Sequence, residues 1–223
     1  MSCNTNSNQE SERSKININH NWQYLENNTA EIEVASNQDD WQLINLPHSW
    51  NALDATDITP GYRRSASWYK KELNIPKIVS GQTYQLYFEG VNIESEIYVN
   101  GKKVGGHTGG YIGFSVDITD VILVGINEVL VRADNGYNPE VIPSQKSDFF
   151  IFGGITRDVW LVTLPKTYLS DLKIRTPQVS AKNAELQATV SVSNSENNKG
   201  LKVKASLLDA KGKTVKTSIF EVT

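Results

Sequence analysis

The sequence predicts an all-β protein built from antiparallel β-sandwiches. Short segments of alternating apolar and polar residues recur along the chain, and turn residues separate them. Residues 95–99 and 102–104 flank Asn100-Gly101, a pair that favours the type I′ turn of a β-hairpin. We find no amphipathic segment that predicts a helix longer than two turns. These features favour packed antiparallel sheets over layers of helices.

Composition and charge limit the classes to which the protein can belong. With 223 residues, 39% of them hydrophobic, the chain can form a packed core, which excludes wholesale disorder. A net charge of −3 argues against a nucleic-acid surface or a polybasic membrane anchor. No apolar run approaches the ~18 residues that a membrane-spanning helix needs. The single cysteine and three widely spaced histidines provide neither an internal disulfide nor a zinc site, so we expect a soluble globular protein.

Residues 1–15 are polar and predict a flexible N-terminal tether. Cys3 followed by this tether resembles the start of a mature bacterial lipoprotein, whose cysteine is acylated. This interpretation predicts lipidation of Cys3 and a location in the periplasm or at the cell surface of a bacterium. The lipid anchor would then be the only contact with a membrane. The alternative is an ordinary exposed thiol after an initiator methionine.

Residues 16–165 predict a first domain made of short strands. The Asn-Gly hairpin lies in its middle, and alternating apolar positions mark the other strands. The expected strands are residues 68–75, 84–88, 95–99, 102–104, 114–118, 129–133 and 158–162.

Residues 166–223 differ in composition and predict a second domain. Aromatic residues nearly vanish, and residues 185–192 and 203–207 alternate between apolar and polar side chains. A turn at Ala210-Lys211-Gly212 precedes a last strand that ends at Phe220, which gives about four strands. Because an immunoglobulin-like sandwich needs ~7 strands, we expect a partial immunoglobulin-like β-sandwich and a chain that is part of a longer polypeptide.

Several motifs follow one another between Trp22 and Leu164. They are Asp40-Trp41, Leu46-Pro47-His48-Ser49-Trp50-Asn51, Ser67-Trp68-Tyr69-Lys70-Lys71, and residues 88–91, 98–105, 107–111, 114–119 and 153–161. In this order and spacing they resemble the N-terminal sugar-binding domain of family 2 glycoside hydrolases, the β-galactosidase and β-glucuronidase group. Residues 166–223 resemble the first strands of the immunoglobulin-like domain of that family.

The resemblance implies a galactose-binding-like jelly-roll sandwich, then an immunoglobulin-like domain, then a (β/α)8 barrel. In this family the two catalytic glutamates lie on the barrel and hydrolyse terminal β-linked sugars with retention. No part of this chain matches the barrel, so we expect no catalytic residue here and an inactive fragment of a β-galactosidase-like enzyme. Its implied partners are an oligo- or polysaccharide and its own C-terminal catalytic barrel. No cofactor is implied, apart from a sodium or magnesium ion in the full-length polypeptide.

Asp148 is the first candidate for substrate binding. It precedes Phe149-Phe150-Ile151-Phe152, where β-galactosidases of the family carry an aspartate that binds the galactosyl group and an alkali-metal ion. A carboxylate suits both roles, because it accepts hydrogen bonds from hydroxyls and offers hard oxygen to a cation. The structural alternative is a loop aspartate that caps a turn.

Asp54, Asp57 and Arg64 are weaker candidates for substrate contact. They lie in the loop of residues 51–64, which is rich in groups that hydrogen-bond sugars and can project toward the barrel in this family. Exposed loop aspartates usually cap turns, so this structural role is the alternative.

Three further features have structural explanations. The glycine-rich run of residues 105–113 follows a hairpin and leads into a strand, whereas a phosphate-binding loop must open a helix. Arg157 and Asp158 are expected to form a buried pair that holds the last strand. The five tryptophans could form a stacking platform for sugars, but large aromatics on strands are more often core, and we expect most of them inside.

Two other functions compete with the glycosidase assignment. The first domain could be a stand-alone carbohydrate-binding module without catalysis, although the incomplete second domain argues against it. It could also be a purely structural domain that positions the barrel and contacts no sugar.

Overall fold

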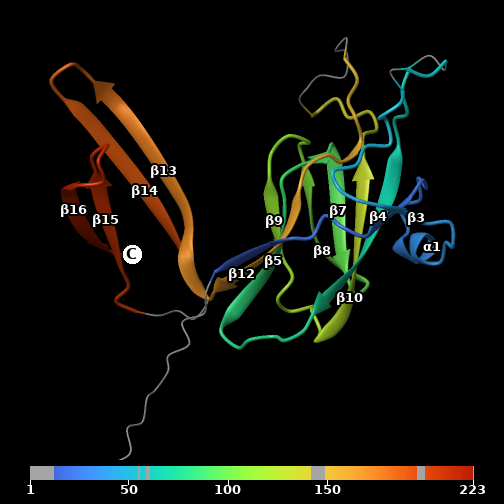
Figure 1. Ribbon diagram of the computed structural model, residues 1–223, viewed down its shortest axis with the longest axis horizontal. Helices are drawn as coiled ribbons and strands as arrows, with labels where there is room; N and C mark the ends of the chain where they lie inside the picture. The colour runs from blue at the N-terminus through green and yellow to red at the C-terminus, as the bar shows by residue number, and fades with distance from the viewer. Residues whose placement is uncertain (1–12, 55, 59–60, 142–148, 195–198, 223) are drawn as a thin grey trace, which may run out of the picture. The chain divides into compact units, whose positions relative to one another are not determined.

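The computed structural model describes residues 13–54, 56–58, 61–141, 149–194 and 199–222. The chain divides between Leu164 and Pro165 into two compact units, which we call unit 1 and unit 2. Both consist of antiparallel strands, so the all-β prediction is confirmed (Figure 1). Cys3 and Asp148 lie outside the described residues, and the roles predicted for them stay predictions.

Unit 1 is a sandwich of a four-stranded and a six-stranded sheet, with one small two-stranded sheet (Figure 1). The four-stranded sheet has the order β1 (Ser14–Asn17), β12 (Val159–Pro165), β5 (Gln82–Phe88), β9 (Phe114–Asp117). The six-stranded sheet has the order β3 (Gln42–Ile44), β2 (Trp22–Leu25), β4 (Ala66–Ile75), β10 (Gly125–Asp134), β7 (Glu94–Val99), β8 (Lys102–Thr108). The small sheet pairs β6 (Val91–Asn92) with β11 (Gly154–Ile155).

Each strand expected in the first domain is present, and the Asn-Gly hairpin is confirmed. Asn100 and Gly101 join β7 to β8 with φ angles of 50° and 76°. Positive φ at both turn positions matches the twist of a tight hairpin, and Asn and Gly tolerate it best. In the glycine-rich run, residues 105–108 belong to β8 and residues 109–113 connect it to β9, so the run opens no helix, as the sequence predicted.

The main core lies between the two sheets. Alternate residues of the six-stranded sheet, such as Tyr69, Ile97 and Val131, face Leu86 and Phe88 of β5, and all five are fully buried. Because successive side chains of a strand point to opposite faces, each strand contributes every second residue to this core. Burying a side chain of this size stabilises the fold by roughly 1.5–3 kcal/mol.

A short helix covers part of the outer face of the six-stranded sheet. Helix α1 (Ile32–Ser36) places Ala35 in a second apolar cluster with Leu25, Trp68 and Leu130. The indole of Trp68 donates to the carbonyl of Thr29 over 3.0 Å, which fastens the segment before the helix to the sheet. Beside the area that the helix covers, this face carries polar side chains of β7 and β10.

The described residues of unit 2 form two antiparallel hairpins, in agreement with the prediction of about four strands. Apolar residues at alternating positions remain exposed, among them Leu172, Ile174 and Ile219, each more than half accessible. The immunoglobulin-like character of this unit stays a prediction. The hairpins pair β13 (Thr167–Val179) with β14 (Ala184–Asn194) and β15 (Lys202–Leu208) with β16 (Thr214–Glu221).

The structure corrects the end of the predicted tether. Strand β1 begins at Ser14, and Ser14 and Lys15 pair with β12. Its polar composition concealed the strand, because an edge strand keeps its place through backbone hydrogen bonds and needs little apolar surface. The Lys15 ammonium also lies 4.0 Å from the ring centre of Trp160.

The predicted buried pair of Arg157 and Asp158 is wrong. Arg157 is exposed, while the half-buried Asp158 accepts a hydrogen bond from the Asn19 side chain over 2.8 Å. Asn19 in turn accepts from the backbone of Val159. A buried guanidinium would need several acceptors, whereas an amide and a carboxylate satisfy each other at the entrance to β12.

The expectation that most tryptophans lie inside holds for only two of them. Trp22 and Trp68 are fully buried, whereas Trp41, Trp50 and Trp160 are half-buried. Trp160 lies on the outer face of the four-stranded sheet, where its indole donates to Glu89 over 2.9 Å. A half-buried tryptophan suits this position, because its ring packs on the sheet while its polar N–H donates to a partner at the surface.

Candidate functional site

The candidate residues converge on one end of unit 1. We call this region the loop end and define it as the described residues of 46–65 and 135–154. The two loops rise from the same end of the sandwich, where β4 begins and β10 ends (Figure 1). It contains Asp54, Asp57 and Arg64, three of the four substrate-binding residues that the sequence predicted.

Two fully buried asparagines join the segments of the loop end. The Asn51 side-chain oxygen accepts from the backbone of Gly153 over 2.7 Å and from the Asn135 amide over 3.2 Å. The Asn51 amide donates to the carbonyl of Arg63 over 2.9 Å. One side chain thus satisfies backbone groups of two loops that have no strand partner.

Asn135 completes the connection from the end of β10. Its amide donates to the carbonyls of Arg63 and Ile151 over 3.1 and 2.9 Å. Its oxygen accepts from the backbone of Ser65 over 3.0 Å. The sequence did not predict the role of Asn51 and Asn135 as organisers of the site. Asn51 ends one of the motifs, but nothing in the pattern of either residue distinguishes a buried loop asparagine from an exposed one.

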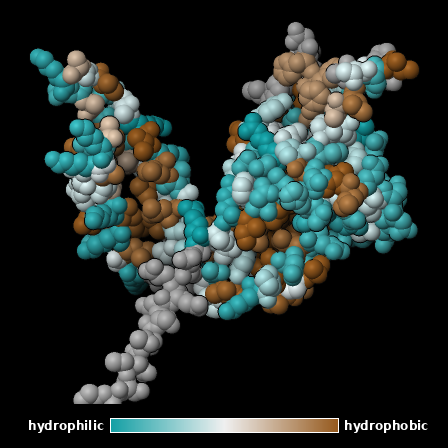
Figure 2. All heavy atoms as spheres, in the orientation of Figure 1, coloured by the Kyte–Doolittle hydropathy of each residue, from teal (hydrophilic) through white to brown (hydrophobic). Residues whose placement is uncertain are grey.

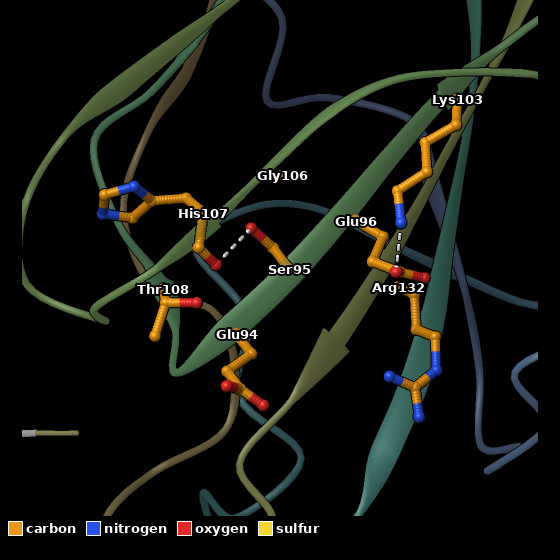
Figure 3. A pocket seen from close by; sticks show the side chains of 8 residues that line it. All are labelled: Glu94, Ser95, Glu96, Lys103, Gly106, His107, Thr108 and Arg132. Carbon is orange, nitrogen blue, oxygen red and sulfur yellow. Dashed lines mark hydrogen bonds and ion pairs between the residues drawn. The ribbon is translucent and has the colours of Figure 1, made fainter. Parts of the chain in front are cut away.

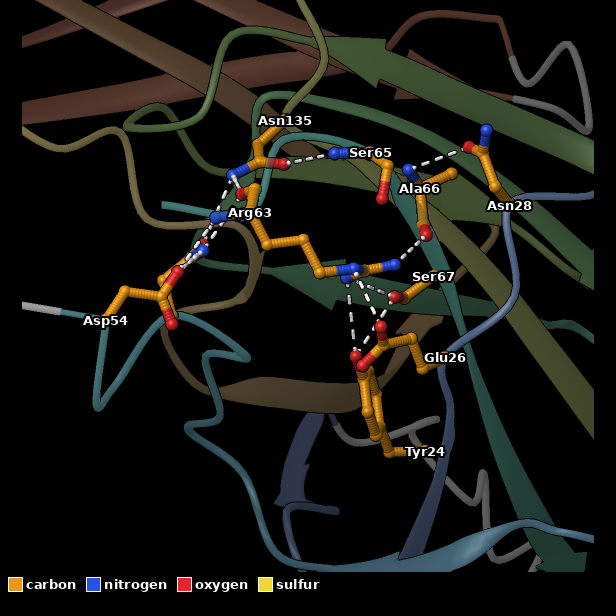
Figure 4. Close-up of polar contacts among 10 residues, drawn as sticks. Tyr24, Glu26, Asn28, Asp54, Arg63, Ser65, Ala66, Ser67 and Asn135 are labelled. Carbon is orange, nitrogen blue, oxygen red and sulfur yellow. Dashed lines mark hydrogen bonds and ion pairs between the residues drawn. The ribbon is translucent and has the colours of Figure 1, made fainter. Parts of the chain in front are cut away.

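Asp54 closes the loop of residues 51–64 from within. One carboxylate oxygen accepts from the backbone of Arg63 over 2.8 Å (Figure 4). The same oxygen accepts from the Asn51 amide over 2.7 Å. These are the contacts of a carboxylate that shapes a loop. Asp57 is exposed. Contact of either residue with a sugar stays a prediction.

Arg63 and Arg64 have different partners. The Arg63 guanidinium donates to Ser67 and to the carbonyl of Ala66 over 2.9 and 2.6 Å, and pairs with Glu26 at 3.1 Å (Figure 4). Arg64 donates to the carbonyl of Asn135 over 3.1 Å and lies over the ring of Tyr62. Arg63 therefore fastens the loop to β4, whereas Arg64 joins the two loops across the loop end.

Trp50 packs against the backbone of the second loop. A side-chain carbon added at Gly153 would lie 2.0 Å from the Trp50 ring, so only glycine fits there. The Arg63 guanidinium carbon lies 5.1 Å from the ring centre on the same tryptophan. The Trp50 indole N–H is buried and has no hydrogen-bond partner among the described residues.

Aromatic side chains gather at the surface of the loop end. Tyr62 stacks on Phe150 with ring centres 4.5 Å apart, and Phe150 meets Phe152 edge-on at 6.1 Å. Phe149 and Phe152 are 51% and 39% exposed, a large fraction for residues that a protein normally buries. Figure 2 shows a group of tan and brown residues over this end of unit 1. We call Tyr62, Phe149, Phe150 and Phe152 the aromatic patch.

His48 lies among aromatic side chains of the six-stranded sheet. Its Nδ1 is 2.8 Å from the Tyr69 hydroxyl, and its ring packs against Tyr24 at 4.8 Å. Burial lowers the pKa of His48 below its ordinary value of 6.5 and raises the pKa of Tyr69 well above 10.0. Both groups are therefore neutral near pH 7, and they serve packing rather than charge.

Metal and membrane features are limited in the described part of the chain. There, no group of three or more His, Cys, Asp and Glu side chains has the geometry to hold a metal ion. No described helix is long and apolar enough to cross a membrane. Asp148 is the residue that the resemblance links to an ion, and it lies outside the described residues, so we derive no step through such an ion.

Replacing the buried amide of Asn135 by a carboxylate tests the connection between the loops. In Asn135→Asp, the group that donates to two carbonyls and to Asn51 becomes an acceptor of the same size. Near pH 8 we expect unfolding to require about 3 kcal/mol less free energy than in the wild type. Protonation restores one donor, so the loss should shrink toward about pH 5.

Chemical denaturation at both pH values measures this effect. Asn45→Asp is the matched control, because Asn45 is exposed and its oxygen only accepts a hydrogen bond, which a carboxylate can also do. An Asn135→Asp protein as stable as the control would contradict the assigned role of Asn135.

The lowered pKa of His48 predicts a loss of stability in acid. Below about pH 6.5 the unfolded chain binds a proton at His48 that the folded chain binds only at lower pH. The free energy of unfolding should therefore fall less steeply between about pH 7.5 and pH 5 in His48→Gln than in the wild type. His20→Gln, at an exposed histidine, is the control and should keep the wild-type slope. Equal slopes in all three proteins would show that His48 titrates normally.

Comparison with known proteins identifies the family. The family model "Glycosyl hydrolases family 2, sugar binding domain" matches residues 10–165. A "Putative beta-glucuronidase" of Formosa agariphila is 65% identical over 210 residues, which are 94% of this chain and 25% of that protein. "Beta-glucuronidase" of Bacteroides fragilis is 36% identical over 191 residues, which are 82% of this chain and 26% of that protein.

The fold of this chain is also similar to that of a solved structure. The crystal structure of a "putative beta-galactosidase" from Bacteroides fragilis has a TM-score of 0.84 and 29% identity, covering 94% of this chain and 33% of that one. The chain thus spans about a quarter of the length of the two curated relatives. Its match to the family model, over most of unit 1, shows that the chain belongs to family 2 of the glycosyl hydrolases and carries the sugar binding domain of that family.

Proposed function

We propose that this chain is the scaffold and substrate-side region of a retaining glycosidase that removes terminal β-linked sugars from oligo- or polysaccharides. The catalytic barrel of that enzyme would lie in another part of the polypeptide. The observation that supports this proposal is the 65% identity, over 94% of this chain, to a relative that is about four times as long. If the chain were a stand-alone carbohydrate-binding module, its similarity to one part of a much longer glycosidase would have no explanation.

The substrate is first a β-glucuronide, from which glucuronate is released, and second a β-galactoside, from which galactose is released. The glucuronide is favoured by the name of the 65% identical relative, and by that of the Bacteroides fragilis relative at 36%. The galactoside, which the sequence motifs favoured, is supported by the name of the solved structure at 29% identity. Both substrates present a terminal pyranose with several hydroxyls, which Asp148 would bind through charged hydrogen bonds.

In this proposal the loop end docks against the catalytic barrel. The aromatic patch offers exposed apolar surface, and the core of a stable interface is rich in aromatic residues. The Asn51 and Asn135 contacts hold the two loops in one arrangement before docking, which lowers the entropy lost on association. The loop end would thereby bring Asp148 to the rim of the active site.

Two further proposals concern the parts of the chain outside the described residues. We infer that Cys3 is acylated and anchors the enzyme at the periplasmic or outer surface of a bacterial membrane. Mass spectrometry of the protein from its native host would test this, since an unmodified cysteine would exclude the anchor. A sodium or magnesium ion at Asp148 is proposed only for the full-length polypeptide.

Kinetics of the complete polypeptide test the function and the role of Asp148. We expect hydrolysis of p-nitrophenyl β-glucuronide or β-galactoside, with kcat/KM reduced about tenfold or more in Asp148→Ala, because a charged hydrogen bond to the sugar is lost. Asp120→Ala is the control, since Asp120 is exposed in unit 1 outside the loop end. Unchanged kinetics in Asp148→Ala would show that Asp148 does not bind the substrate. Inactivity of the wild type toward every terminal β-glycoside would refute the proposed function.

Stability of the complete polypeptide tests the docking of the aromatic patch. In the 223-residue chain, Phe152→Ala removes a side chain that is 39% exposed, so we expect a loss of about 1–2 kcal/mol. In the complete polypeptide the same change should cost about 3 kcal/mol or more, because the ring would be fully buried in the interface. Equal losses in the two proteins would argue against docking through Phe152.

A further inference from the structure

A polar groove lies on the outer face of the six-stranded sheet, beside the area that α1 covers. It has a volume of about 470 Å³ and is formed by β7, β8 and the end of β10 (Figure 3). This volume is in the range of small-ligand sites. Its side chains are mostly charged or hydroxylic, and in Figure 3 the ring of His107 turns away from them. The lining residues are Glu94, Ser95, Glu96, Lys103, Gly106, His107, Thr108 and Arg132.

The strand register places five of the lining residues in two rows across the sheet. Arg132, Glu96 and Gly106 lie opposite one another across β10, β7 and β8. Glu94 lies opposite Thr108 in the next row. Residues paired directly across antiparallel strands point to the same face, so both rows face the groove. Gly106 ends the first row without a side chain, and an added carbon there would lie 2.4 Å from the carbonyl of Ser95.

Neighbouring groups hold the groove side chains in place. Asn138 donates to Glu94 over 2.6 Å, and the Tyr98 hydroxyl donates to Glu96 over 3.0 Å. Arg132 donates to the carbonyl of Thr29 over 3.3 Å. Side chains fixed in this way lose little conformational freedom when a ligand binds.

The groove combines hydrogen-bond donors and acceptors. Glu94 and Glu96 contribute two carboxylates, and Lys103 and Arg132 contribute two cations. Lys103 pairs with Glu96, and Arg132 pairs at 3.1 Å with Asp134, which lies opposite Glu94 at the edge of the groove. The hydrogen bond from Lys103 lowers the pKa of Glu96, which therefore remains ionised at neutral pH. A hydroxyl both donates and accepts, so a ligand with several neighbouring hydroxyls can satisfy both kinds of group. An anionic ligand would meet both carboxylates.

We propose that this groove is a saccharide-binding site for one or two neutral sugar units of an oligosaccharide. Glu94 and Glu96 accept hydrogen bonds from the sugar hydroxyls, while Arg132 and the Thr108 hydroxyl donate to them. The site is built by strands of the sheet face, whereas the proposed function uses the loop end. It would hold a polysaccharide chain through sugar units that are not cleaved.

Amide NMR spectra of the 223-residue chain, titrated with cellotetraose, test this site. We expect shifts confined to residues of β7, β8 and β10 and to the contacts at Asn138 and Thr29. Tetragalacturonate and inorganic phosphate serve as anionic probes and should bind at least about tenfold more weakly. The absence of shifts with millimolar cellotetraose, or tighter binding of either anion, would overturn the proposal.

Two variants assign the binding to the groove. Glu94→Gln retains an acceptor for Asn138 but loses the charge, and Thr108→Val replaces an exposed hydroxyl with a methyl group. Each should raise the dissociation constant for cellotetraose about fivefold to tenfold or more. Thr189→Val makes the same change at an exposed strand position of unit 2 and should bind as the wild type does. Wild-type affinity in both groove variants would contradict the assignment, whatever the activity of the complete polypeptide.

Discussion

The loop end of unit 1 depends on two buried asparagine side chains. Irregular backbone inside a protein must have its N–H and C=O groups satisfied, and none of the described strands pairs with residues 63–65 or 151–153. Asn51 and Asn135 supply the missing donors and acceptors. The position of Arg63, the contact between Trp50 and Gly153, and the presentation of the aromatic patch all follow from this connection.

The outer surface of unit 1 separates into regions of different chemistry. The loop end exposes aromatic rings, which favour burial against another part of the protein. The groove on the six-stranded sheet exposes charged and hydroxylic groups in fixed positions, which favour a hydroxylated ligand. A sandwich permits this division because its core uses only the inward residues of each strand and leaves the outward residues and loops to other roles.

Much of the fold could be predicted because its signals are local. The alternation of residues 129–133 and the Asn100-Gly101 pair each occupy a few neighbouring positions, and both elements formed as expected. The errors arose where the sequence carries no such signal. Strand β1 is polar and is held by its pairing with β12. Asp158 accepts a hydrogen bond from Asn19 instead of forming a buried pair with the neighbouring Arg157.

The sequence by itself determined most of the longer strands, the Asn-Gly turn and the family, since these depend on neighbouring residues and on motifs in fixed order. Only the tertiary structure decided that Asn51 bonds to Asn135 across 84 positions of sequence. It also decided that Glu96 lies between Arg132 and Gly106 on one face of the sheet. The physical reason is register: a shift of one residue in strand pairing would turn these side chains to the opposite face.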